Sequence, residues 1–238
     1  MDSVGSYVIS SVVIPPASSD LTILATVKDD WMIKGGKDDS FLSRAISRCS
    51  VAAQQFCNRS FGIATYQDAF RLEQGYRTGR IVNGARSPIK LSAWPLVSVV
   101  SVTVTPPNSA PTILTAGTDY EVDQVTGFIY RLDSLGQPRD WNPVQTVIIY
   151  QAGYILPGQN PVDFPGAQTL PVDIEDAVGR MVFSRYSERQ RDPFIKSEEV
   201  AGISRVDYIV GNPNQGDGGN MSPDVADILN NYRQPVTG

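Results

Sequence analysis

The sequence predicts an α+β fold: a helical bundle with an antiparallel β-rich insertion and extended termini. Two long segments, one early and one late in the chain, carry apolar residues at helical spacing. Between them lie short runs of β-branched and aromatic residues, separated by turn-forming residues. A chain of 238 residues can bury one sizeable core with a smaller β subdomain attached.

Changes in composition along the chain predict six segments. We expect an extended, helical or β character for each from its content of proline, glycine and periodic apolar residues. The segments are an N-terminal arm at 1–20, a first helical part at 21–63, the β-rich insertion at 64–154, a Pro-rich excursion at 155–170, a second helical part at 171–210, and a flexible linker with a C-terminal helix at 211–238.

The first 20 residues mix serine and valine and contain the pair Pro15-Pro16, which suits an extended arm or an edge strand better than a core element. A short helix is predicted next, and the pair Gly35-Gly36 should end it. Its apolar positions are Leu21, Leu24, Val27 and Trp31.

The clearest helix follows, because Asp38, Asp39 and Ser40 offer N-capping groups before a long apolar stripe. That stripe consists of Phe41, Leu42, Ala45, Ile46, Cys49, Ala52, Ala53 and Phe56. Cys49 and Cys57 are eight positions apart, about 12 Å along a helix axis, which is too far for a disulfide. We therefore expect both cysteines to be reduced packing residues.

The middle of the chain predicts strands, which together should form one small antiparallel sheet. The strands are expected at 96–104, 120–122, 128–132 and 144–150. Four prolines between residues 155 and 171 then oppose regular structure and predict a stiff excursion.

A second long helix is predicted from about Pro171 and Asp173 to a point before Asp192-Pro193. One face of it carries Ile174, Ala177, Val178, Met181, Val182 and Tyr186. We expect the core of the bundle to form where two apolar stripes meet. These stripes are Phe41, Ala45 and Cys49 on the first long helix and Ile174, Val178 and Val182 on the second.

The C-terminal part begins with a Gly- and Asn-rich linker at 211–220 and continues with Ser222-Pro223-Asp224, which favours the start of a helix. An apolar stripe follows at Val225, Ile228, Leu229 and Tyr232. A helix of about eleven residues is marginal alone in water, so this stripe needs a surface to cover it. That surface can belong to another protein or to the same subunit.

Composition and motifs indicate a protein that is not an enzyme and binds no metal or cofactor. The chain has no histidine, which excludes Ser-His-Asp and Cys-His catalytic systems. Residues Gly35-Gly36-Lys37 lack the remaining residues of a phosphate-binding loop, and the acid pairs Asp29-Asp30 and Asp38-Asp39 fit capping better than calcium binding. With a net charge of −5 and no long apolar run, sequence-specific DNA binding and membrane insertion are both unexpected.

A series of motifs in a fixed order resembles the head-tail connector proteins of tailed phages, the adaptor or head-completion family. The motifs are Lys37–Leu42, Trp94–Val99, Gly117–Asp123 with Thr126-Gly127 and Ile129–Leu132, Val147–Tyr154, Pro171–Ala177, and Arg189–Pro193 with Ser197–Val200. The resemblance covers about residues 21 to 210, and departs from the family at both ends and in the Pro-rich excursion.

The resemblance implies a structural virion protein at the head-tail interface, assembled in the host cytoplasm. Its expected partners are the portal protein, a stopper, nozzle or other tail-proximal neck protein, and further copies of itself in a homo-oligomeric ring, expected to be a dodecamer. DNA would pass through the lumen of the ring without sequence-specific binding. On this reading the stripe Val225, Ile228, Leu229 and Tyr232 is the portal interface.

A tail-fibre or baseplate-type binding module is the alternative, because the aromatic-rich strands permit it. An adaptor should be a monomer that assembles on a portal ring, whereas a fibre module should form a stable trimer alone. The two classes therefore differ in mass with and without portal rings.

Overall fold

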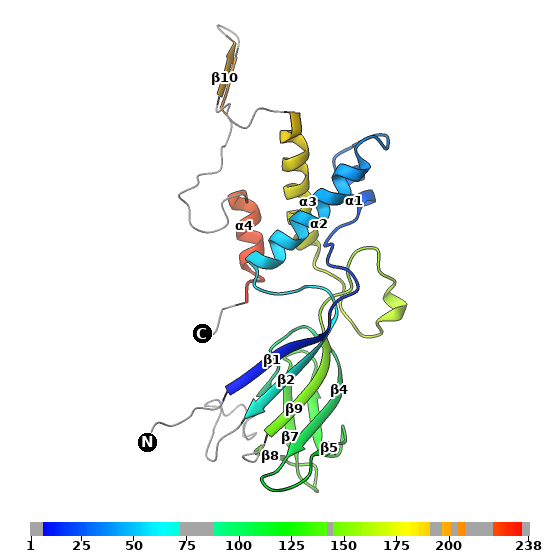
Figure 1. Ribbon diagram of the computed structural model, residues 1–238, viewed down its shortest axis with the longest axis vertical. Coiled ribbons are helices and arrows are strands. Elements are labelled where there is room, and N and C mark those ends of the chain that lie inside the picture. The colour runs from blue at the N-terminus through cyan, green and yellow to red at the C-terminus, as the bar shows by residue number, and fades with distance from the viewer. Residues whose placement is uncertain are drawn as a thin grey trace, which may run out of the picture. The chain divides into compact units, whose positions relative to one another are not determined.

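The computed structural model describes residues 7–71, 88–141, 145–190, 197–200, 204–207 and 221–234. The chain divides into two compact units. The first, called the β unit here, lies within Met1–Ala17, Gly62–Ile155 and Asn160–Gln168. The second, called the helical unit, lies within Ser18–Phe61, Leu156–Gln159 and Thr169–Gly238. Helices and antiparallel sheets are both present, as Figure 1 shows, so the fold is α+β.

The larger sheet of the β unit has five strands, and all of its strand pairs are antiparallel. In spatial order these strands are β1 (Tyr7–Ile14), β2 (Ala64–Arg71), β9 (Gln145–Ala152), β4 (Leu96–Thr105) and β5 (Thr112–Leu114). β1 is an edge strand of this sheet, whereas the sequence assigned residues 1–20 to an extended arm. β2 was not predicted from the sequence.

A second sheet contains four strands: β3 (Ile89–Lys90), β7 (Phe128–Leu132), β6 (Tyr120–Asp123) and β8 (Pro138–Arg139). The expectation of one sheet is therefore wrong, because β4 and β9 belong to the larger sheet and β6 and β7 to this one. Side chains from both sheets form one apolar cluster, which includes Val102, Ile129 and Ile148, each fully buried. Two layers thus cover each other's apolar faces.

The helical unit contains α1 (Leu24–Asp30), α2 (Asp39–Phe56), α3 (Val172–Ser187) and α4 (Pro223–Asn230). α3 packs against both α2 and α4. α1 contacts both α2 and α3. The unit also holds the 3-10 turn η2 (Glu188–Gln190) and the hairpin of β10 (Ser197–Val200) and β11 (Ser204–Asp207). Within the described ranges the chain is richer in strands than the predicted bundle with an insertion.

Three expectations about individual segments need correction. α1 begins at Leu24 and ends at Asp30, before the glycine pair, because the backbone turns at Met32, whose φ is +52°. The Pro-rich excursion contains the short 3-10 helix η1 (Pro161–Asp163) in the β unit. α4 has 8 residues, not eleven, and the predicted linker at 211–220 lies outside the described residues. No helix in the described part of the chain is long and apolar enough to cross a membrane.

Candidate interaction surfaces

The predicted core residues lie where α2 packs against α3. Ala45 and Cys49 on α2 are buried, with exposed fractions of 4% and 0%. Ile174, Val178 and Val182 on α3 are each fully buried. Phe41 is only partly buried and packs beneath the Arg189 guanidinium, which lies 5.2 Å from the centre of the ring. This contact is a cation–π interaction at the margin of the α2–α3 interface.

Asp38 connects the start of α2 to the end of α3. The sequence predicted that its side chain caps α2, but it makes no such hydrogen bond. Its carboxylate accepts hydrogen bonds from Arg189 Nη1 at 2.6 Å and from the Tyr186 hydroxyl at 3.1 Å. The Arg189 hydrogen bond is the main cause that lowers the pKa of Asp38. Both partners favour the ionised carboxylate, so this contact weakens as the pH falls through that lowered pKa.

The C-terminal helix α4 is docked on its own subunit. Val225 and Leu229 are 1% and 0% exposed, whereas Ile228 and Tyr232 are partly buried. The Cys57 thiol donates to the Leu229 carbonyl at 3.4 Å, and the Gln234 N–H donates to the Cys57 carbonyl at 2.8 Å. The stripe was assigned from the sequence to the portal contact, with its own subunit as the alternative, and Val225 and Leu229 are instead buried against their own chain. In this structure these two side chains are not available to a portal protein.

Polar contacts hold α4 beside α3. The Tyr232 hydroxyl donates to the Asp173 carboxylate at 2.8 Å, and its ring meets Phe61 edge-on at a centroid distance of 6.4 Å. Arg180 on α3 bridges Asp176 at 2.9 Å and Asp224 at 3.1 Å. Deletion of residues 211–238 would remove these contacts and uncover α3. Such a deletion is therefore expected to destabilise the helical unit.

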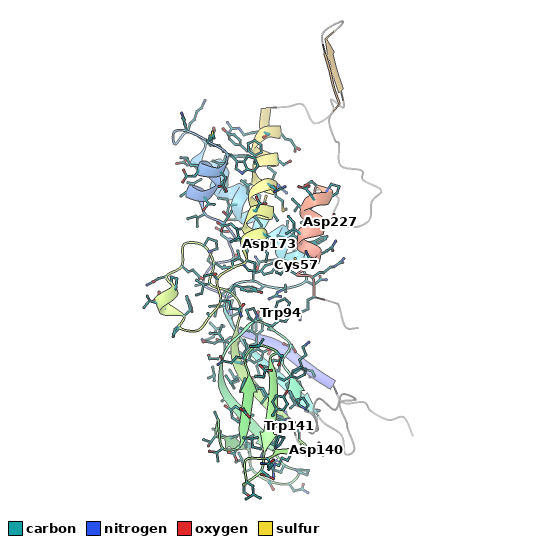
Figure 2. All side chains as sticks on the ribbon, turned by 180° about the vertical axis from the view of Figure 1, so that it is seen from behind. Cys57, Trp94, Asp140, Trp141, Asp173 and Asp227 are labelled. Atoms are coloured by element: carbon teal, nitrogen blue, oxygen red, sulfur yellow. The ribbon has the colours of Figure 1, made fainter. Side chains whose placement is uncertain are left out.

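Cys57 and Cys49 are free thiols and both are fully buried. Burial raises the pKa of Cys57 to about 11 and also raises the pKa of Cys49. A protonated, inaccessible thiol is neither a nucleophile nor a metal ligand. The two cysteines are packing residues of the helical unit, and Figure 2 labels Cys57 near the base of α4.

A buried polar network in the β unit was missed at the sequence level. Asp68 in β2 is 0% exposed and accepts hydrogen bonds from the Tyr150 hydroxyl at 2.9 Å and the Ser92 N–H at 2.8 Å. The Tyr150 hydroxyl in turn accepts from the Ala93 N–H at 3.0 Å. Burial, with the nearby Asp68 charge, raises the pKa of Tyr150. The available signal was an aspartate at an inward position of a strand, where an apolar residue is the norm.

β1 exposes an apolar surface at the edge of the five-stranded sheet. Its exposed aliphatic residues are Val8, Ile9, Val12, Val13 and Ile14, with exposed fractions of 48 to 59%. Edge strands commonly carry charged residues or proline, which prevent association with other strands. This strand contains neither. Its register against β2 shifts between Val12 and Ile14.

Comparison with known proteins finds no matching family model and no matching curated protein. Among solved structures, a chain in the virion of a native gene transfer agent particle matches with a TM-score of 0.50 and 14% identity, over 96% of this chain and 97% of that chain. Chains in two neck structures match over the same shares. One is the neck of an empty gene transfer agent particle computed with C6 symmetry (TM-score 0.49, 14% identity), and the other is the neck of a native particle computed with C12 symmetry (0.46, 16%). The chain thus has the fold of a component of the gene transfer agent virion.

Proposed function

We propose that this chain is a structural head-tail adaptor of a phage-like particle. It forms a homo-oligomeric ring under the portal, extends the DNA channel, and provides the attachment surface for the next neck or tail component. The observation that carries the proposal is the fold match to a virion chain at a TM-score of 0.50, which spans 96% of this chain and 97% of that one. Coverage of both chains from end to end includes the helical unit as well as the β unit.

The motifs that resemble the adaptor family occupy structurally demanding positions, which supports the same proposal. Gly153 lies in the Val147–Tyr154 motif directly after β9, with a φ of +131°, and a Cβ at this position would overlap the backbone of Gly62. Gly127 has a φ of +72° in the turn between β6 and β7, where glycine is the favoured residue. These glycines are needed for the connections of the fold, so their presence in the motif series has a physical reason.

On this proposal the helical unit acts as a bundle that lines the channel and meets neighbouring copies, and the β unit faces a stopper, nozzle or other tail-proximal protein. Each chain carries a net charge of −5, so a ring of many copies has an acidic lumen that lets DNA slide. The proposal includes no catalytic role, no cofactor and no membrane. Its location is the head-tail interface of the virion.

The proposal is tested by measuring particle mass for the purified chain alone and after mixing with portal rings. We expect a monomer alone and, after mixing, a complex that sediments with the portal and contains a ring of this chain. A stable trimer without portal would instead favour the tail-fibre or baseplate-type module. Absence of co-sedimentation, or robust hydrolase activity of the purified chain, would contradict the adaptor role.

We propose that the C-terminal segment also contacts the portal, through the residues that docked α4 leaves accessible. Asn230 and Asn231 are exposed, on a helix whose buried side is held by Val225 and Leu229. The double variant Asn230→Glu/Asn231→Glu should keep its melting temperature and lose about tenfold in portal affinity, because two charges must be desolvated in the contact. Co-sedimentation with portal rings measures this loss.

The matched control is Ser109→Glu/Gln137→Glu, which adds the same charge at two exposed turn positions of the β unit. The control should bind portal rings like the parent chain. Equal portal affinity for the parent and the α4 variant would show that this surface of α4 is not the contact.

A further inference from the structure

The outer face of α2 carries arginines without carboxylate partners. Arg44 and Arg48 are exposed, one helical turn apart, and no ion pair within the described residues involves either of them. The neighbouring Ser43 hydroxyl donates to the Asp39 carbonyl of its own helix, at 2.9 Å. The one acid in α2, Asp39, is paired with Lys28 at 2.8 Å. The face is therefore positive in a chain whose net charge is −5.

The same face continues into a shallow groove at the C-terminal end of α2. The groove is lined by Val51, Gln54, Gln55, Asn58, Arg59 and Ser60. Val51 is 44% exposed, and Arg59 lies over the Phe61 ring at 5.0 Å from its centre. A surface that combines arginines with an aliphatic side chain and amides has the composition of a protein–protein interface.

The α3–α4 side of the helical unit has the opposite charge. It exposes the four carboxylates of Asp173, Asp176, Asp224 and Asp227, and among the described residues Arg180 forms ion pairs with two of them, Asp176 and Asp224. Arg180 and Tyr232 hold three of these carboxylates in place, and no hydrogen bond or ion pair in the described part of the chain involves the fourth, Asp227. Figure 2 labels Asp173 and Asp227 where α4 lies beside α3.

The two charged surfaces are built by different helices of the unit, and the arginine face lies on the side of α2 away from α3. α2 buries Leu42, Ala45 and Cys49 on the side that packs against α3, so Arg44 and Arg48 lie on its far side. α3 in turn packs against α4 as well as α2, and the four acidic side chains are exposed on α3 and α4. Two different, complementary surfaces on one unit suit head-to-tail contacts, which close into rings when each copy turns by a fixed angle.

We propose that the arginine face of α2 in one copy of this chain docks on the acidic α3–α4 surface of the next copy. This inference rests on the proposed ring and names the interface that builds it. Two copies with a net charge of −5 each repel one another overall. The arginines of one surface and the carboxylates of the other have opposite charges, so they attract when these surfaces meet. Double-stranded DNA is the other occupant with suitable charge for the arginine face. DNA is less suitable because the face includes Val51 and an amide-lined groove and has few cations for phosphate neutralisation.

Charge reversal tests the interface. Arg48→Glu and Asp227→Arg are each expected to weaken copy–copy association about tenfold, because each places like charges opposite one another. The double variant Arg48→Glu/Asp227→Arg should recover most of the association, since it reverses both surfaces. All three should melt like the parent chain because both side chains are exposed. Lys90→Glu and Glu121→Arg are the matched controls, with the same charge changes at exposed positions of the β unit.

Association is measured in two ways: as the number of copies bound per portal ring, and by sedimentation of the chain alone over a concentration series. Loss in both single variants with recovery in the double variant supports the interface. Three outcomes overturn the interface. These are unchanged association in either single variant, no recovery in the double variant, and no association of copies either on portal rings or in the chain alone. Loss of DNA binding in Arg48→Glu with unchanged association assigns the face to DNA instead.

Failure of this interface and failure of the adaptor role give different results. A chain that co-sediments with portal rings but ignores the charge reversals keeps its proposed function and loses the interface. A chain that never binds portal rings but self-associates with the expected charge pattern keeps the interface and loses the proposed function.

Discussion

Val178→Asp is expected to lower the free energy of unfolding of the helical unit by at least about 2 kcal/mol. Val178 is 0% exposed, on the part of α3 that packs among the other helices. The substitution removes apolar contacts and places a carboxylate at a fully buried position of the helix. Urea unfolding followed by the helical circular dichroism signal measures the loss.

Val172→Asp is the matched control for this variant. Val172 is the first residue of the same helix and is 79% exposed, so the same substitution removes little packing there. An acid at the N-terminal end of a helix is also favourable to the helix dipole. The control should therefore unfold at the same or a slightly higher urea concentration than the parent. Equal midpoints for the parent and Val178→Asp would show that the α2–α3 core is not formed as described.

Asp68→Ala is expected to lower the free energy of unfolding of the β unit by about 3 kcal/mol, because two buried donors lose their acceptor. These donors are the Tyr150 hydroxyl, at 2.9 Å, and the Ser92 N–H, at 2.8 Å. While the β unit stays folded, no water replaces the lost carboxylate as acceptor for these two donors. Thermal unfolding followed by near-ultraviolet circular dichroism, which reports on tyrosine environments, measures the effect.

Tyr150→Phe should cost less than Asp68→Ala, because it leaves the Ser92–Asp68 hydrogen bond in place. Tyr130→Phe, at a partly exposed position of β7, is the control and should unfold like the parent. The pKa of Tyr150 is raised by burial, so the folded state holds this proton more tightly than the unfolded chain. The stability it contributes is complete below the ordinary tyrosine pKa of about 10 and decreases as the pH rises above it. A parent-like melting temperature for Asp68→Ala would contradict the role of this network.

The long helices could be predicted because their apolar residues repeat along one face over many turns. α2 and α3 lie where the periodic residues placed them, and most of the predicted core residues are buried between them. Phe41 was placed in the core by the same pattern but lies at its margin under Arg189. Periodicity identifies the apolar face of a helix, whereas the depth of each side chain depends on the elements that cover it.

The strands were predicted better than their pairing. β7 has the predicted bounds, β4 and β6 each end one residue later than predicted, and β9 begins one residue later and ends two residues later. Their separation into two sheets was not predicted, because a turn sequence indicates only that the chain reverses. β2 was missed because its strand character depends on burial of Asp68, and that burial depends on Tyr150 and Ser92, which are distant in the sequence.

By itself, the sequence determined the α+β class, the position of both long helices, and the reduced state and packing role of the cysteines. These follow from local periodicity and from residue chemistry, which act within a few residues of one another. Only the tertiary structure decided where α4 docks, which strands share a sheet, and that Asp38 binds Arg189 instead of capping α2. Each of these is a choice between partners far apart in the chain, and the choice depends on which surface completes the burial of apolar groups and satisfies the polar ones.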